Sequence, residues 1–420
     1  MSIKDFFAGH LQRRRQKQYM KMMRGYIPVF SSFGNDIYAS DLVQNAIRRI
    51  CTEMSKLQPR HIITDRDGMQ RVVYGSDLNR LLRYGPNPLM TTSDFLEKIV
   101  YLREVKKNCY ILPVYDRIPL KDGRYKRRYT ALYPLNPSEV EYSTDDAGNL
   151  YISFWFQGNP AERYEFRYED IIHWRKDFTE NDIQGGDEFG NPDPKSLLKL
   201  LETDHVAMQS IEKGVKTSNS ISGIIKQNTM LDDEDLESKT KEFEAKILNN
   251  QSGFLVMDLK NDFIQAKLQP EFISSDVSMQ VIQRILSTWG MSIKIYNGEF
   301  DEESYQAFYE CVLESMIISL GRVFSRVLFT QRELDVGNEI VFYNEGLQYM
   351  KTENKIQVST ILTNIGALTD NQVLAIFGYP PFEGGNIRHQ SLNYVNRDMA
   401  DAYQMLNAGG RKKEAADGSS

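Results

Sequence analysis

Residues 301–330, DEESYQAFYECVLESMIISLGRVFSRVLFT, carry a long amphipathic pattern around which the rest of the chain can be ordered. The pattern has no proline, opens with three acidic residues and ends with the basic Arg322 and Arg326, as a helix dipole favours. Its apolar and aromatic residues have the spacing of one helix face: Tyr305, Phe308, Tyr309, Val312, Met316, Leu320, Val323, Phe324 and Val327. We predict one uninterrupted helix of about 29 residues, about 43 Å long. Periodicity alone leaves open whether it is a structural beam or an ordinary core helix.

Upstream of this helix, residues 35–174 change from helical to alternating patterns. The helices are expected at 35–56, 76–83 and 92–104, the first capped by Ser40 or Asp36 and the third by Ser93. The strands are expected at 58–64, 72–73, 110–115, 129–134, 140–143, 151–157, 163–167 and 171–174. This order predicts an α+β lobe with a largely antiparallel sheet.

A second set of elements begins after a Gly-, Pro- and Asp-rich boundary at residues 185–194. We expect a helix at 196–218, then a small insert with β-runs at 223–226, 253–259 and 263–268 around a helix at 231–249. A helix at 276–290 and a turn or loop at 291–299 lead into the long helix. The insert between two helices resembles a stalk with a tip. Beyond the long helix we expect a strand at 339–343, helices at 352–364 and 369–377, and a disordered end from 401.

Composition narrows the classes of function. The 420 residues carry a formal net charge of −6, which argues against a protein that grips nucleic acid over its whole surface. No apolar run reaches the roughly 18 residues of a membrane span, and the N-terminus does not read as a signal peptide, so we expect a cytosolic protein. The basic cluster at residues 13–24 is typical of a solvated, mobile arm more often than of a segment that binds nucleic acid.

Candidate chemical motifs all have simpler explanations. The three cysteines and five histidines are scattered, so neither a disulfide framework nor a metal site is expected. Asp232, Asp233, Glu234 and Asp235 lie at a helix start, where capping explains them. Gly384 and Gly385 predict a rigid turn, because no phosphate-binding lysine or helix follows. His173 is expected to be a satisfied structural histidine. We therefore predict no enzyme activity, no catalytic or metal-binding residues and no cofactor.

A series of short motifs recurs in one order along the chain. They are the helix and Ser-Lys-Leu-Gln-Pro run at 43–59; Leu81, Leu82, Pro86, Asn87 and Pro88; Thr92, Asp94, Phe95 and Leu96; Asn108, Tyr110 and Leu112; Leu132 to Pro137; Asp170 to His173; Gly366, Leu368, Thr369 and Asn371; and Gly378 to Gly385. In this order the chain resembles the portal proteins of tailed bacteriophages, in the branch typical of long-tailed phages, over residues 43–393. Two features depart from that family. Trp289-Gly290-Met291-Ser292-Ile293 stands where an aromatic-Gly-Val-Pro-Pro run is common, and the long helix lacks a proline often found after its first turns.

The resemblance implies an α+β portal fold with a mixed α/β wing, a helical stem, a small α/β clip, a long spine helix and a helical crown. The implied boundaries are a basic N-terminal arm at 1–34, the wing at 35–195, stem helices at 196–222 and 271–291 around the clip at 223–270, a channel loop at 292–300, the spine helix and wing strand at 301–345, the crown at 346–400, and a disordered tail at 401–420.

The resemblance also implies a function. Similar proteins form a ring, usually of twelve copies, at one capsid vertex, through which double-stranded DNA is packaged and ejected. The implied partners are other copies of the chain, DNA in transit, the terminase large subunit, head-tail adaptor proteins, and the major capsid protein and scaffold, with no membrane. The implied location is the virion, after assembly in the host cytoplasm.

By the same resemblance, residues that could face passing DNA lie in the channel loop and on the stem helices. The candidates are Ile293, Lys294, Ile295, Tyr296, Asn297, Gly298 and Glu299, with Gln280, Gln283, Arg284, Lys213 and Lys216 as choices on the stem. Two other functions stay open. One is a soluble multidomain enzyme acting on nucleotides or sugars, and the other is a virion adaptor without a channel; formation of a ring separates the portal from both.

Overall fold

The computed structural model describes residues 40–119, 125–157, 159–192, 195–218, 223–227, 261–265, 275–343 and 352–390. The basic arm, the helix expected at 231–249, the strand expected at 253–259 and the tail at 401–420 lie outside these residues. The chain divides into two compact units, each discontinuous in sequence. Unit 1 comprises residues 1–52, 97–112 and 134–299, and unit 2 comprises residues 53–96, 113–133 and 300–420.

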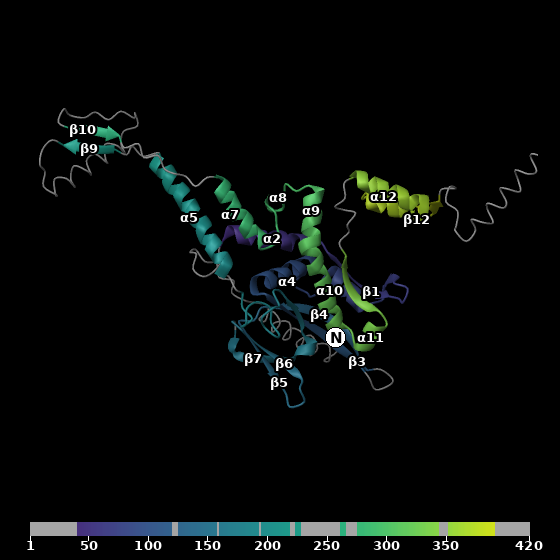
Figure 1. Cartoon of the computed structure of the whole chain (residues 1–420). Helices are drawn as coiled ribbons and strands as arrows, with labels where there is room; N and C mark the ends of the chain where they lie inside the picture. The colour runs from purple at the N-terminus through teal and green to yellow at the C-terminus, as the bar shows by residue number, and fades with distance from the viewer. Residues whose placement is uncertain are drawn as a thin grey trace, which may run out of the picture. The chain divides into compact units, whose positions relative to one another are not determined.

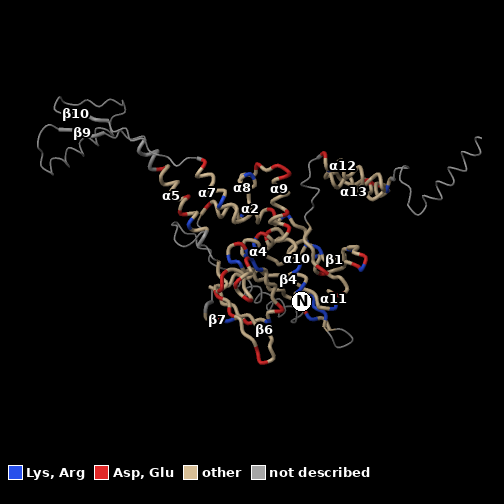
Figure 2. Tube along the Cα trace, viewed as in Figure 1, with Lys and Arg blue, Asp and Glu red and all other residues tan. Residues whose placement is uncertain are grey.

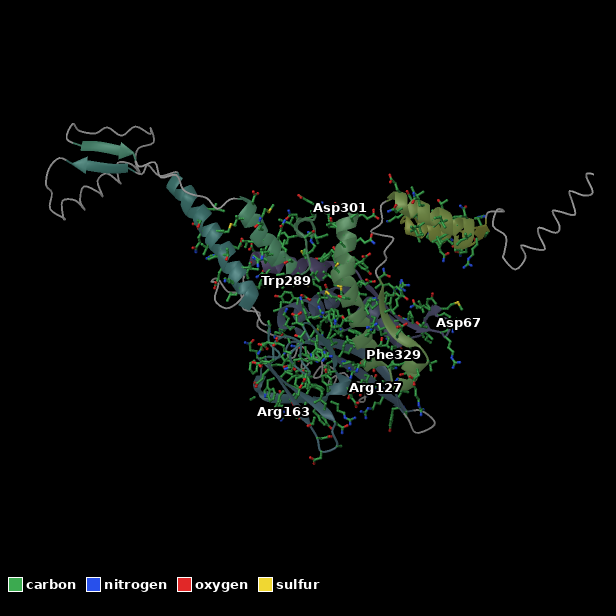
Figure 3. All side chains as sticks on the ribbon, viewed as in Figure 1. Asp67, Arg127, Arg163, Trp289, Asp301 and Phe329 are labelled. Atoms are coloured by element: carbon green, nitrogen blue, oxygen red, sulfur yellow. The ribbon has the colours of Figure 1, made fainter. Side chains whose placement is uncertain are left out.

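The long helix of unit 2 is present, but it is not one uninterrupted α-helix. It consists of α9 (Glu302–Phe308), a π-helical stretch, η3 (Tyr309–Leu313), and α10 (Glu314–Leu328). Figure 1 shows these pieces as one rod, and Asp301 and Phe329 lie at its two ends in Figure 3. Within η3 the amide of Glu314 donates to the carbonyl oxygen of Tyr309, five residues earlier. Such a bond defines a π-bulge, which sequence periodicity does not reveal.

The two ends of the rod have local causes. The Asp301 carboxylate accepts a hydrogen bond from the Ser304 amide at 2.8 Å, which caps the first turn. Figure 2 shows the acidic residues gathered at this end. At the other end the backbone of Phe329 is extended, so the helix stops two residues before the predicted Thr330.

The buried face of the rod differs from the predicted stripe within η3. Phe308, Met316, Leu320 and Phe324 are buried, as expected. Val312, expected on the stripe, is only half-buried, and its neighbour Leu313 is buried in its place. The five-residue step from Phe308 to Leu313 is the spacing that a π-helical turn brings onto one face.

Unit 2 packs this rod against a three-stranded antiparallel sheet with the order β11-β1-β2. The central strand β1 (Gln58–Thr64) has the predicted bounds and pairs with β2 (Gln70–Val72) as the expected hairpin and with β11 (Asn338–Tyr343). The helix α3 (Asp77–Tyr84) packs on β1, and its N-cap is Ser76.

A glycine lets α10 approach β11 closely. A Cβ at Gly321 would lie 2.8 Å from the carbonyl oxygen of Ile340. One turn later, the Ser325 hydroxyl donates to the Gly321 carbonyl at 2.7 Å and accepts from the Ile340 amide at 2.8 Å. Phe324 lies between Phe95 and Phe342, with ring centroids 6.4 Å and 5.4 Å away. The small residue and the hydroxyl therefore join helix to sheet, and the aromatic rings fill the core beside them.

The C-terminal elements of unit 2 are α12 (Thr352–Asn364), β12 (Ile365–Thr369), α13 (Asp370–Ile376) and β13 (Arg388–Gln390). The bounds of α12 match the prediction, and Thr369 forms a capping box with Gln372 at the start of α13. The turn predicted at Gly384 and Gly385 is present, because the Gly385 amide donates to the Phe382 carbonyl at 3.2 Å; the Gly385 carbonyl in turn accepts from the Asn371 amide at 2.8 Å.

The strands of the N-terminal lobe pair antiparallel, as predicted, but the expected one sheet is wrong, because they divide among several three-stranded sheets. One has the order β5-β6-β7, and another the order β4-β3-β8. The strands are β3 (Asn108–Pro119), β4 (Tyr125–Leu135), β5 (Glu139–Thr144), β6 (Leu150–Phe156), β7 (Asn159–Arg167) and β8 (Ile172–Arg175), with a 3₁₀ turn, η2 (Tyr168–Asp170), before the last. The division between the units falls within β3 and β4. Phe154, Phe156 and Trp174 are fully buried in unit 1.

The remaining elements are mostly helical. They are α2 (Asp41–Met54), α4 (Thr92–Lys106), α5 (Lys195–Ser218) and α7 (Ser275–Ser287), with the antiparallel pair β9 (Gly223–Gln227) and β10 (Asn261–Gln265). The cap of α4 is Thr91 and not the predicted Ser93, because the Thr91 hydroxyl accepts from the Asp94 amide and donates to its carboxylate. In unit 1, α5 and α7 lie side by side (Figure 1).

Unit 1 contains a buried histidine with both ring nitrogens satisfied. His173 Nε2 lies 3.0 Å from Asn108 Oδ1, and its Nδ1 lies 2.9 Å from the Tyr168 hydroxyl. Asn108 Nδ2 donates to backbone carbonyls, including that of Gly185 at 2.9 Å, so Oδ1 is the acceptor and His173 Nε2 carries the hydrogen. This confirms the expected structural histidine.

A buried carboxylate in unit 1 holds two cations. The Glu104 side chain is 1% exposed and accepts from Arg103 Nη1 at 2.8 Å and from Lys176 Nζ. The Arg103 guanidinium also lies over the Trp174 ring, 4.6 Å from its centroid. The three charges form a closed cluster beside the core strand β8.

Candidate functional site

The segment predicted to be a channel loop is a short helix in unit 1. Residues Ile293–Asn297 form α8, and the Ser292 hydroxyl caps it by accepting the Ile295 amide at 3.4 Å. Gly298 ends the helix with φ 81°, the left-handed conformation that glycine adopts without steric cost. The prediction of a turn or loop at 291–299 is therefore wrong. Ser292 and Ile293 stand where the family run has prolines, and serine supplies the cap that starts a helix.

The α8 helix is held against α2. Ile295 is 2% exposed and the preceding Met291 is also buried. Arg49 Nη2 donates to the backbone oxygen of Tyr296 at 3.2 Å, and Asn45 Nδ2 donates to the side-chain hydroxyl of Tyr296 at 3.4 Å. The segment is therefore fixed by one buried side chain and by two side chains of a helix about 250 residues earlier in the sequence.

The side chains that remain outward on α8 are polar or charged. Lys294, Asn297 and Glu299 are exposed, and Ile293 and Tyr296 are half-buried. Ile295, also a candidate for the channel surface, points into unit 1 instead. An exposed ammonium and an exposed amide next to each other on one turn can contact a phosphate without enclosing it.

The stem candidates divide between two helices. Gln280 and Arg284 are one turn apart on α7, and both are exposed, as is Gln283. The α7 helix contacts α8, so the structure brings these candidates and Lys294 into one region of unit 1. Lys213 and Lys216 belong to α5, but their side chains lie outside the described residues.

Sequence reasoning missed the residues that anchor the segment, Asn45 and Arg49. Both lie on α2, whose apolar residues Leu42, Val43, Ala46, Ile47 and Ile50 are all buried. Nothing in the sequence pairs a polar residue of this helix with one that lies 247 residues away. Only the fold makes the connection.

No feature of the described residues suggests metal chemistry or a membrane span. Within them, no group of three or more His, Cys, Asp or Glu side chains is placed to hold an ion. Cys51 and Cys109 are buried, and burial raises the pKa of both thiols well above the usual range. No helix in the described part of the chain is long and apolar enough to cross a bilayer.

Solved structures with the same fold come from phage-like particles. A chain in the virion of a native gene transfer agent particle superposes with a TM-score of 0.55 at 15% identity, covering 82% of this chain and 92% of that chain. A chain in the neck of the native particle, computed with C12 symmetry, gives a TM-score of 0.54 at 14% identity, covering 85% of this chain and 95% of that one. The protein therefore shares the α+β fold of chains in such particles.

Sequence comparison defines the family. The model described as phage portal protein matches residues 42–378. Probable portal proteins of Lactococcus phages p2 and SK1 are each 20% identical over 374 residues, which is 85% of this chain and 85% of each relative. The chain belongs to the phage portal protein family. The resemblance inferred from the ordered motifs and the α+β portal fold are thus confirmed.

Proposed function

We propose that this protein forms a ring at one capsid vertex, and that double-stranded DNA is packaged and ejected through the channel of the ring. In this proposal the ring assembles in the host cytoplasm with scaffold and major capsid protein. The terminase large subunit, and later head-tail adaptor proteins, dock on the clip. The observation that carries the proposal is the α8 segment, which is firmly anchored yet presents Lys294 and Asn297 outward, in a chain of the portal family.

The proposed parts follow the predicted boundaries. Residues 35–195 and 301–345 would be the wing with its spine helix, 196–222 and 271–291 the stem, 223–270 the clip, 292–300 the channel segment and 346–400 the crown. The β9 and β10 pair falls in the proposed clip and α12 to β13 in the proposed crown. The division into two compact units does not follow these boundaries, because each unit gathers distant stretches of sequence.

Two further observations support a ring. The neighbouring helices α5 and α7 leave Val206, Met208, Val277 and Met279 exposed by about half or more. Exposed apolar side chains on neighbouring helices can mark a surface that another protein covers, and in this proposal neighbouring copies of the chain cover them. The neck of the gene transfer agent particle, whose chain shares the fold, was computed with C12 symmetry.

Charge supports passage of DNA without capture. Twelve copies at −6 each would carry about −72, so most of the ring would repel phosphate. Side chains such as Lys294 and Asn297 could then touch passing phosphates weakly. Each cation contributes little at physiological salt, and this allows the duplex to slide.

The first experiment measures mass and shape. The purified full-length chain, alone and with scaffold protein, is passed over a sizing column with light scattering, and the same peak is imaged in negative stain. We expect a ring of about a dozen subunits with a central hole of duplex width. A monomer or dimer under every condition would overturn the proposal and favour the alternative hypothesis of a soluble multidomain enzyme. A discrete assembly without a central hole would favour a virion adaptor without a channel.

The second experiment tests the channel segment. Particles carrying K294A/N297A are expected to package or retain DNA several-fold less well than wild type, because the outward phosphate contacts are removed while Ile295 and Tyr296 keep α8 in place. The matched control is R66A, which removes an exposed cation of unit 2 and should leave packaging unchanged. Packaged DNA is measured by nuclease protection. Equal packaging and retention by K294A/N297A and wild type would show that the α8 contact is dispensable.

A further inference from the structure

Unit 2 contains a cavity of about 780 Å³ that the proposed channel does not use. Its wall is built by the connection from α2 into β1, by β2 with the turn that follows, by α3, and by the first turn of α4. The lining residues are Ser55, Lys56, Leu57, Gln58, Pro59, Arg60, Val72, Tyr74, Asn79, Arg80, Leu82, Arg83, Tyr84, Thr92 and Ser93. All of them lie within residues 53–96, so the cavity belongs to one continuous stretch of a single unit.

The cavity is basic in a protein whose net charge is negative. Four of its lining residues are Lys or Arg, and none is Asp or Glu. Arg80 and Arg83 are three residues apart on α3, the spacing that places both on one face of a helix. Among the described residues, no carboxylate pairs with Arg60, Arg80 or Arg83. Arg60 Nη2 donates to Gln58 Oε1 at 3.0 Å and its guanidinium lies over the Tyr343 ring, 5.6 Å from the centroid. The charges of Arg80 and Arg83 are therefore the ones most open to an anionic ligand, and Arg60 adds a third positive charge beside them.

The fourth cation is already partly neutralised. Lys56 Nζ lies 2.8 Å from Glu53 Oε1, and the Tyr305 hydroxyl donates to Glu53 Oε2 at 3.0 Å. The Glu53 side chain is 6% exposed and does not line the cavity. The positive charge that a ligand would meet is therefore concentrated on the arginines.

Aromatic rings stand beside the arginines. Tyr74 is 92% exposed and Tyr84 is 68% exposed, although tyrosines normally bury much of their ring. The Arg83 guanidinium lies over the Tyr84 ring, 5.3 Å from its centroid. A ligand with both carboxylates and an apolar or aromatic side chain could pair with the guanidinium groups and cover the exposed rings.

The start of α4 closes one side of the cavity. Thr92 and Ser93 are in its first turn and line the cavity, whereas Asp94 of the same turn caps the helix and offsets the dipole at its N-terminus. The Thr92 hydroxyl donates to the Leu82 carbonyl at 2.7 Å, which ties this turn to α3. The backbone of α3 and the start of α4 therefore keep a fixed geometry, from which the exposed side chains of Arg80 and Arg83 extend.

We propose that this cavity is a docking site for a short acidic peptide segment of a partner protein. The carboxylates would pair with Arg80, Arg83 and Arg60, and an apolar or aromatic side chain would pack on Tyr74 and Tyr84. A cavity of this volume accommodates a ligand of drug size, which is a few residues of peptide. The net charge of −6 favours a short ligand over a long nucleic acid. A short peptide feels mainly charges within the screening length of about 8 Å, whereas a duplex would also meet the acidic surface beyond.

The test uses the full-length chain and two charge-reversed double variants. The probe is a short fluorescein-labelled peptide of alternating Asp and Glu with one Leu and one Tyr, and its neutral counterpart has Asn and Gln in place of the acids. We expect the acidic peptide to bind wild type and the neutral peptide not to bind. R80E/R83E should weaken binding by at least about tenfold. The matched control R66E/R71E makes the same charge change on exposed arginines of unit 2 outside the cavity, and should leave affinity within about twofold.

Three results would overturn the assignment. They are no binding of the acidic peptide to wild type, equal loss in both double variants, and tighter binding of an oligothymidylate of about twelve nucleotides that R80E/R83E abolishes. Circular dichroism melting checks folding, and R80Q/R83Q replaces the reversed pair if R80E/R83E fails to fold. The cavity lies within one chain, so a failure to form rings would leave this result intact.

Discussion

Replacing Glu104 by alanine is expected to lower the free energy of unfolding by about 3–5 kcal/mol. The variant keeps Arg103 and Lys176 in place, with 12% and 18% of their side chains exposed, but removes the carboxylate that both contact. Burial already lowers the pKa of both cations, and the Glu104 charge partly opposes that effect. Without Glu104, these two poorly solvated positive charges are left with the half-exposed carboxylate of Asp177 as the nearby anion. Urea unfolding followed by circular dichroism measures the loss.

The control for this prediction is an ion pair of similar length at the surface. Arg167 Nη1 and Glu169 Oε1 are 2.9 Å apart, but their side chains are 49% and 67% exposed. E169A should therefore lower the free energy of unfolding far less than E104A does. Similar losses in E104A and E169A would show that the buried cluster contributes no more than an exposed pair.

Acidification is expected to destabilise the protein through His173. Burial, with a smaller contribution from the Arg175 charge, lowers the pKa of His173 to about 3. The unfolded chain takes up a proton near pH 6.5, while the folded chain keeps the ring neutral down to about pH 3. Stability is therefore complete above about pH 6.5 and falls as the pH drops from there towards 3. The slope approaches about 1.4 kcal/mol per pH unit, so about 2 kcal/mol is lost between pH 6.5 and pH 5.

The variant H173Q isolates this effect. It should be less stable than wild type at neutral pH, because the hydrogen bonds to Tyr168 and Asn108 are disturbed, but its stability should fall less steeply between pH 6.5 and pH 5. H205Q, at an exposed position on α5, should keep the wild-type slope. Urea midpoints at a series of pH values measure both. Parallel curves for H173Q and wild type would show that another group titrates.

Local patterns predicted most elements of the fold. The strand β1 and the helix α12 have the predicted bounds, since the turn at Asp65 to Gly68 ends the first and Thr352 opens the second. What depended on distant contacts was not predicted. The strands of the N-terminal lobe divide into separate sheets because β8 pairs with β3 and not with β7, and alternation within a strand does not specify its partner.

The channel role of residues 292–300 stays a prediction, but the loop expected there was wrong. The departure from the proline-rich family run at residues 289–293 leads directly into the helix α8. Ser292 is a good helix N-cap, so the sequence held a signal for α8 that the family pattern obscured. The basic cavity was not foreseen, because Arg60 follows a helix whereas Arg80 and Arg83 lie beyond a hairpin, and only the packing of α3 on β1 brings them to one wall.

The π-helical stretch shifts the phase of the buried residues along the rod. Phe308 and Leu313 occupy one face with five residues from one to the next, whereas an α-helix reaches the same face after about four. The two halves of the rod are therefore out of phase by one residue, about 100° of helical rotation. A hydrophobic repeat counted from Asp301 therefore needs one extra residue within residues 309–313 before it coincides with the buried residues of α10. An α-helix without the π-helical stretch would need one residue fewer to place both halves of the rod with the same faces buried.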